Sequence, residues 1–99
     1  MVKEARVLCK TPTPGKQPTR IPKWKYEAVR HAILKVVPKD EPGIRFAELA
    51  GEVEKLLPAE DKDRLGSVGW HTTVVKLDME VKGEILRIVG SNPQRLVRN

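Results

Sequence analysis

Few side chains in this sequence have the chemistry that catalysis or metal binding requires: one cysteine and two histidines. Cys9, His31 and His71 lie far apart in the chain. No zinc-ligand spacing, phosphate-binding glycine motif or nucleophile elbow is present. The acidic residues between positions 48 and 63 have the spacing of an exposed helix face rather than of two converging carboxylates. We therefore expect no catalysis, no metal, no cofactor and no small-molecule ligand.

The other chemistry in the chain is that of cationic side chains. Lys and Arg number 19 against 13 Asp and Glu, a net charge of +6. The excess is uneven, because residues 1–40 carry +7, residues 41–65 carry −3 and residues 66–99 carry +2. Such asymmetry is typical of proteins that bind a polyanion, although surface charge also serves solubility alone. The charge asymmetry therefore predicts a polyanion as the partner, which the winged-helix arrangement predicted below narrows to double-stranded DNA, and it leaves solubility as the alternative.

The segment between Ser67 and Gly83 is predicted to be the helix that recognises DNA. Ser67 can accept a backbone N–H at the helix start, and Gly83 is placed to end the helix. Apolar residues recur on one side of this helix, and we expect that side to face the core: Trp70, Val74, Leu77 and Val81.

The opposite side of the same helix is predicted to face the DNA. Its polar side chains suit contacts with base edges or phosphates, and Val75 suits a thymine methyl group. Asp78 and Glu80 oppose deep insertion, because phosphates repel them. The alternative is a protein interface formed by Val75 and Met79, or packing of these two residues against the N-terminal hairpin. The predicted DNA contacts on this helix are His71, Thr72, Thr73 and Lys76.

Two further groups of residues are candidate phosphate contacts. The C-terminal strands, 84–89 and 95–98, form a hairpin that carries Arg87, Gln94, Arg95 and Arg98. The alternative is that these arginines keep the protein soluble and prevent other chains from pairing with the edge of the sheet. The second group surrounds Trp24 and suits phosphate pairing with base stacking: Lys16, Arg20, Lys23 and Lys25.

For the group around Trp24, the alternative is that the ring packs under the N-terminal hairpin while the lysines are solvated. Lys23 and Lys25 lie in the first turn of a predicted helix, where the macrodipole disfavours cations. Their position therefore favours a bound anion near this helix end.

The elements that position these residues follow from apolar periodicity and from proline. Strands at Glu4–Cys9 and 19–21 flank a proline-rich turn and predict an N-terminal hairpin. A helix is predicted over 22–37, a second over 46–57 and one short turn over 59–64. The predicted inner faces are Tyr26, Val29, Ile33, Val36 and Val37 in the first helix, and Phe46, Leu49, Ala50, Val53, Leu56 and Leu57 in the second.

This order predicts an α+β, mainly helical protein of the winged helix-turn-helix type. One domain, 1–99, would comprise an N-terminal hairpin extension (1–21), a helical core (22–83) and a wing (84–99). Cys9 cannot form an intramolecular disulfide, which fits a reducing interior. With neither a signal peptide nor a membrane span in the sequence, we expect a cytoplasmic protein that contacts no membrane. A homodimer is consistent with DNA sites that consist of two half-sites, each bound by one copy of the chain.

Three segments of the chain resemble a known family. They are residues 25–35, Trp70 followed by residues 75–85, and the Pro14-Gly15-Lys16 turn that precedes the Lys-Tyr-Glu-Ala helix. Together they are similar to a family of small bacterial proteins of unknown function with a winged-helix-like fold. The similarity spans most of the chain and implies that fold, but no activity or functional residue. Winged-helix proteins bind DNA in most cases and other proteins in a minority, so the fold alone is only an analogy.

Overall fold

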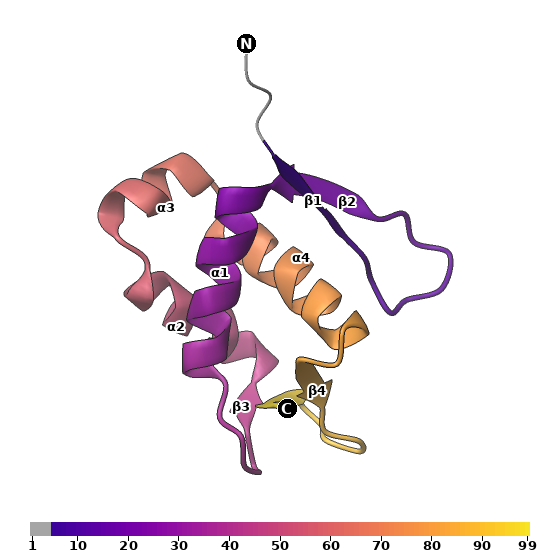
Figure 1. The fold of residues 1–99 in the computed structure, drawn as a ribbon. Coiled ribbons are helices and arrows are strands. Elements are labelled where there is room, and N and C mark those ends of the chain that lie inside the picture. Colours follow the sequence, from indigo (N-terminus) through magenta and orange to yellow (C-terminus); the bar gives the residue numbers. More distant parts are fainter. Residues whose placement is uncertain (1–4) are drawn as a thin grey trace.

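The structure, a computed structural model, describes residues 5–99. Within this range the chain forms four helices and two small antiparallel sheets (Figure 1). The predicted α+β class is thus confirmed. The elements are β1 (Arg6–Cys9), β2 (Thr19–Pro22), α1 (Lys23–Val36), β3 (Ile44–Arg45), α2 (Phe46–Leu56), α3 (Ala59–Leu65), α4 (Val68–Val81), β4 (Ile85–Arg87) and β5 (Arg95–Arg98).

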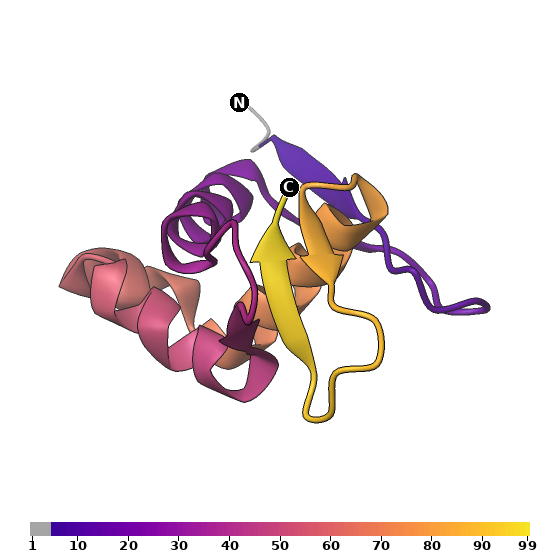
Figure 2. The same ribbon diagram turned by 90° about the horizontal axis from the view of Figure 1, so that it is seen from below.

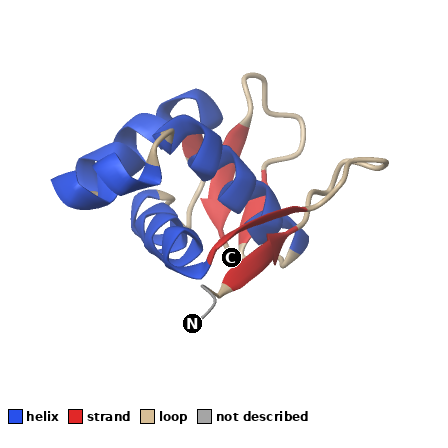
Figure 3. Cartoon of the chain, turned by 90° about the horizontal axis from the view of Figure 1, so that it is seen from above, coloured by secondary structure: helices blue, strands red, loops and turns tan. Residues whose placement is uncertain are grey.

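The predicted N-terminal hairpin is present, and β1 pairs with β2 in antiparallel register. Glu4, predicted to begin its first strand, lies outside the described residues. Val7 pairs with Ile21, which is buried, while Leu8 and its partner Arg20 are exposed. Strand β1 packs against α1 and α4, and the loop that joins the strands projects beyond the helices (Figures 1 and 3).

Helices α1, α2 and α4 form the body of the protein, and each packs against the other two. The apolar faces predicted for α1 and α2 are largely confirmed, because Val29, Ile33, Leu49 and Val53 are fully buried. Leu56 is the exception and lies exposed at the end of α2. Helix α3 replaces the predicted single turn and contacts α4.

The second sheet has the order β3-β5-β4, with β5 between its two neighbours (Figure 2). The predicted C-terminal hairpin is present, whereas β3 was not predicted. Its two residues follow Gly43, whose φ of +70° favours glycine. A Cβ at position 43 would overlap the carbonyl oxygen of Leu96 in β5. Glycine therefore lets the chain approach β5 closely enough to add this strand.

The ends of α4 are as predicted, but its orientation is the reverse of the prediction. Ser67 Oγ accepts a hydrogen bond from Trp70 N at 3.1 Å. The face predicted to be internal is outside, with Trp70 48% and Val81 44% exposed. Val75 and Met79 are fully buried, so the predicted exposed interface of these two residues is wrong. The physical reason is that α4 lies among α1, α2 and the hairpin, where its charged side chains find partners.

No helix among the described residues has the length and apolar character to cross a membrane.

Candidate nucleic-acid interface

The polar residues predicted to read DNA from α4 are mostly internal. His71 and Thr72 are buried, and His71 Nδ1 lies 2.7 Å from the carbonyl oxygen of Ser67. Thr73 is partly exposed, and its hydroxyl donates to the Gly69 carbonyl at 3.0 Å. His71 and Thr73 thus contact backbone carbonyls of their own helix, and the Thr72 hydroxyl is buried without a hydrogen-bond partner, so most of the predicted base-reading face is not on the surface.

Lys76, the predicted cation of that face, is only 2% exposed. Its Nζ donates to Gln94 Oε1 at 2.8 Å and lies 4.5 Å from the centre of the Phe46 ring. Glu80 Oε2 lies 2.8 Å from the same Nζ and forms an ion pair with it. Burial lowers the pKa of Lys76, and Glu80 opposes that change. Lys76 and Gln94 therefore join α4 to the C-terminal hairpin rather than to a partner.

The arginines of the C-terminal hairpin divide between internal contacts and solvent. Arg87 is half-exposed, and its Nε lies 3.5 Å from Glu80 Oε1. Arg95 Nη1 donates to the Gly43 carbonyl at 3.5 Å, and Arg98 Nε donates to the Val37 carbonyl at 3.1 Å. Of these three predicted phosphate contacts, Arg87 is the most accessible.

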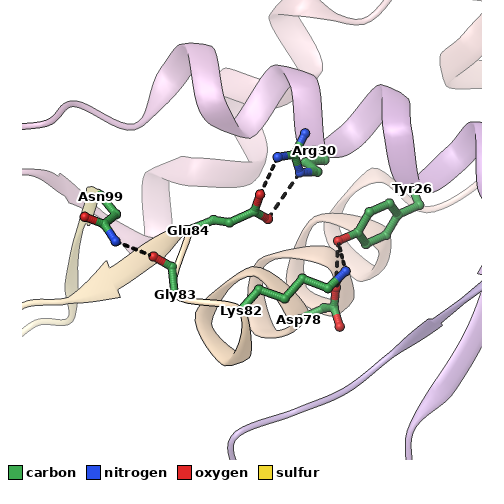
Figure 4. Close-up of polar contacts among 7 residues, drawn as sticks. All are labelled: Tyr26, Arg30, Asp78, Lys82, Gly83, Glu84 and Asn99. Atoms are coloured by element: carbon green, nitrogen blue, oxygen red, sulfur yellow. Dashed lines mark hydrogen bonds and ion pairs between the residues drawn. The ribbon is translucent and has the colours of Figure 1, made fainter.

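A second polar cluster, centred on the buried Asp78, joins α1 to α4 (Figure 4). Asp78 Oδ2 accepts a hydrogen bond from Tyr26 at 2.6 Å and lies 2.8 Å from Lys82 Nζ. The other oxygen, Oδ1, accepts from the backbone N–H of Lys10 at 3.0 Å. Burial acts to raise the pKa of Asp78, but the hydrogen bonds from Lys82, Tyr26 and Lys10 outweigh it, and the pKa is lowered. Asp78, predicted to repel DNA phosphates, thus stays ionised inside the protein, and the charge of Lys82 balances it.

Beside this cluster, Arg30 of α1 makes a two-pronged contact with the carboxylate of Glu84 (Figure 4). The hydrogen bonds from Arg30 lower the pKa of Glu84. Asn99 Nδ2 donates to the Gly83 carbonyl at 2.9 Å, which holds the C-terminal residue against the end of α4.

Cations that remain accessible gather where the N-terminal hairpin meets α1 and α3. Lys23 N donates to the Ala5 carbonyl at 2.8 Å, which fixes the start of α1 to the base of the hairpin. Lys25 Nζ lies 3.4 Å from the Leu65 carbonyl, which brings the end of α3 to the same place. We give the name basic end to Trp24 and the cations of this region, which are Arg20 on β2, Lys23 and Lys25 in the first turn of α1, and Arg64 on α3.

Trp24 is the aromatic centre of the basic end. The guanidinium carbon of Arg64 lies 4.4 Å from the centre of its ring, and Lys25 Nζ lies 5.7 Å away. The ring is half-buried against α3 rather than under the hairpin. Cations over an aromatic face are held by its quadrupole. Sequence reasoning missed Arg64 because the contact depends on the position of the short helix α3.

The charge balance at the basic end favours an anion. The first turn of α1 has no acidic residue and no side-chain cap, so the positive end of its dipole is uncompensated. Glu27 lies 3.7 Å from Lys23 Nζ, but both side chains are more than half exposed, so this pair is weak. Asp61 shares a shallow hollow with Trp24 and Arg64. Lys16, predicted to join this cluster, lies instead on the hairpin loop.

The residues with metal-binding or nucleophilic chemistry lie on separate elements. His31 is exposed on α1, His71 is buried on α4, and burial raises the pKa of Cys9 to about 11. Within residues 5–99, no group of three or more His, Cys, Asp or Glu side chains is arranged to hold a metal ion.

A family of unknown function, DUF6958, matches residues 6–96, from β1 into β5. The chain belongs to this family. The family description assigns no activity, and no curated protein or solved structure matches the chain significantly.

Proposed function

We propose that the protein binds double-stranded DNA through the basic end, by contacts with phosphates rather than with bases. The observation that carries the proposal is the placement of Arg64 and Lys25 beside the Trp24 ring, next to Lys23 in the same turn of α1 and close in the chain to Arg20 on β2. Among residues 5–99, only Lys23 of these four has a carboxylate within ion-pair distance. Cations without an acidic partner are free to replace the counterions of a phosphate backbone.

The order of the elements supports the same proposal. We infer a winged-helix arrangement in which α1, β3, α2, α4, β4 and β5 follow one another and β5 is central in the sheet. Helix α3 is an insertion before α4 in this interpretation. Many winged-helix proteins bind DNA, but that is an analogy of fold and not of site.

The mode of binding differs from that of a helix inserted into the major groove. The outward face of α4 is apolar, and Lys76 is internal, so α4 offers few hydrogen bonds to base edges. Binding should therefore depend on charge more than on sequence. We expect dissociation constants of about 10⁻⁴ to 10⁻⁶ M at physiological salt, as for other non-specific complexes.

The test is fluorescence anisotropy with a labelled duplex of mixed sequence, titrated at salt concentrations between about 50 and 200 mM. Four phosphate contacts predict a slope of log affinity against log salt of about −3 to −4. The double variant Arg20→Ala/Lys25→Ala should bind more weakly and reduce the magnitude of the slope by about 2.

The matched control is Lys35→Ala/Lys39→Ala, which removes the same charge near the other end of α1. If both double variants lose affinity equally, net charge rather than the basic end attracts the DNA. Absence of binding by the wild-type protein at the lowest salt concentration would overturn the proposal altogether.

A further inference from the structure

The outward face of α4 carries a continuous row of apolar side chains. Trp70, Val74, Leu77 and Val81 recur at helical spacing, and we call this row the α4 stripe. Trp70 and Val81 are among the most exposed large apolar residues of the chain, while Val74 and Leu77 are half-buried. A row of this kind on a small protein marks a surface that another molecule covers. Tryptophan is also the residue type most enriched among binding hot spots.

The N-terminal hairpin forms one wall beside the α4 stripe. A pocket of about 220 Å³ lies between them, lined by Val74 and Leu77 on the helix and by the hairpin and its loop. The hydrogen bond from Lys10 N to Asp78 fixes this wall to α4. The hairpin loop extends past the wall and away from the helices (Figures 1 and 3). The middle of the stripe, at Val74 and Leu77, thus forms one side of this pocket, and the hairpin forms the other; we call the pocket, together with the stripe that continues past it at both ends, the groove.

The charges around this groove are positive, whereas the stripe itself is uncharged. Lys10 and Lys16 line the pocket on the hairpin side. Arg87 is half-exposed, and its Nε lies 3.5 Å from Glu80 Oε1, whose carboxylate also pairs with Lys76. An occupant must therefore combine an apolar surface with negative charge at its edge.

We propose that the α4 stripe binds an amphipathic helix of a partner protein that carries acidic residues beside its apolar face. The stripe spans about 16 Å, because Val81 lies eleven positions after Trp70 and each step adds about 1.5 Å along the helix. This length matches about three turns of a helix with apolar anchors at positions i, i+3 or i+4, and i+7. Carboxylates at the edge of that helix would pair with Lys10 and Lys16.

Two other occupants fit the observations less well. A second copy of the chain in an antiparallel two-fold arrangement would place its own lysines against Lys10 and Lys16, and each copy carries a net charge of +6. Nucleic acid would leave its phosphates and base edges without hydrogen-bond donors along the stripe. The proposal is independent of DNA binding, because it uses none of the residues of the basic end.

The experiment is a selection from a phage-displayed library of random peptides on the immobilised wild-type protein. We expect enriched peptides to be acidic and to carry apolar residues at helical spacing. Synthetic copies should lose at least tenfold in affinity with Trp70→Asp or Leu77→Asp, and several-fold with Lys10→Ala/Lys16→Ala. In the Trp24→Phe variant Trp70 is the remaining tryptophan, and its emission should shift to the blue on binding.

The matched control is Leu56→Asp, because Leu56 on α2 is 49% exposed, nearly the same as Trp70, and lies away from the groove. This variant should bind the peptides normally. Circular dichroism and urea denaturation establish that each variant is folded, and Val81→Lys replaces Trp70→Asp if the latter unfolds. Failure to enrich peptides, or peptides that bind Trp70→Asp as well as wild type, would overturn the proposal.

Two assays separate the other occupants. Sedimentation equilibrium that detects a dimer in the wild type and a monomer in Trp70→Asp would assign the stripe to a second copy and overturn the proposal. DNA affinity that falls with Trp70→Asp but not with Arg20→Ala/Lys25→Ala would assign the stripe to nucleic acid and overturn both proposals. If DNA binding depends only on the basic end, the peptide selection determines whether the α4 stripe binds an amphipathic helix.

Discussion

The phenolic hydroxyl of Tyr26 donates a hydrogen bond of 2.6 Å to Asp78 Oδ2, across 52 positions of the chain. Lys82 Nζ lies within 2.8 Å of both the tyrosine oxygen and the carboxylate. The three side chains therefore form a closed polar cluster between α1 and α4. Because Asp78 is almost completely buried, its charge depends on these partners.

The first prediction concerns the Tyr26 hydroxyl. Tyr26→Phe keeps the ring in the core and removes one donor to a buried charge, which should lower the free energy of unfolding by about 1.5–3 kcal/mol. Urea denaturation measures the change. Thr73→Val removes a partly exposed hydroxyl within α4 and serves as the control, with an expected effect below about 0.5 kcal/mol. Equal effects of the two variants would contradict an energetic role for the Tyr26–Asp78 bond.

The second prediction is a loss of stability in acid that depends on Asp78. Burial acts to raise the pKa of this carboxyl, but the hydrogen bonds it accepts from Lys82, Tyr26 and Lys10 lower the pKa on balance. A group whose pKa is lower in the folded state than in the unfolded state stabilises the fold above its unfolded pKa, about 3.9 for Asp. This stability is lost as pH falls through the folded pKa, because the unfolded chain binds the proton first.

The measurement for this prediction is the urea midpoint between about pH 6 and pH 2.5, on either side of the unfolded pKa of Asp. Asp78→Asn should be less stable than wild type at neutral pH and should show a smaller further loss in acid. Asp40→Asn, on an exposed turn, is the control and should keep the wild-type pH profile. If Asp78→Asn and wild type have parallel profiles, the cluster does not stabilise the ionised carboxylate.

The third prediction tests the reversed orientation of α4. Met79→Ala should lower the free energy of unfolding by about 2–5 kcal/mol, since it leaves a cavity in the core. Val81→Ala, two residues later on the exposed face, should cost less than about 0.5–1 kcal/mol. Thermal or urea denaturation measures the loss of stability in each of the two variants. The opposite ranking would restore the orientation that the apolar pattern predicts.

The apolar pattern predicted the wrong face because α4 has apolar residues on both sides. In α1 and α2 a single apolar stripe faces polar residues, and the core residues Val29 and Leu49 follow from it. In α4 the buried face includes Lys76 and Asp78, two residue types that are normally exposed. Their burial depends on partners distant in the chain, so local periodicity cannot predict it.

In the candidate site too, the residues that are neighbours in the sequence were predicted, and the residue that depends on a distant contact was not. Lys23, Trp24 and Lys25 form the first turn of α1, and Arg20 precedes them on β2, so their closeness follows from the sequence. Arg64 joins them through α3, whose placement has no local signal. The helix ends were predictable, because the Ser67 cap is a local interaction.

The fourth prediction concerns the strand that the sequence did not predict. Gly43→Ala should destabilise the protein by more than about 1–2 kcal/mol, because alanine disfavours a positive φ and its Cβ would overlap the Leu96 carbonyl. Gly51→Ala is the matched control, since Gly51 lies within α2 with open space around it. That substitution should stabilise the protein by about 0.5–1 kcal/mol through helix propensity. Urea denaturation should give these opposite signs; two destabilised variants would contradict the packing of β3 on β5.

The burial of Cys9 has a kinetic consequence. Its thiol faces α4 from the end of β1, and its pKa of about 11 leaves about 0.1% thiolate at pH 8, against roughly a quarter for a free cysteine. Labelling by a thiol reagent must therefore wait until the hairpin separates from the helices or the whole chain unfolds. The labelling rate of Cys9 therefore measures how often the hairpin opens locally or the whole chain unfolds.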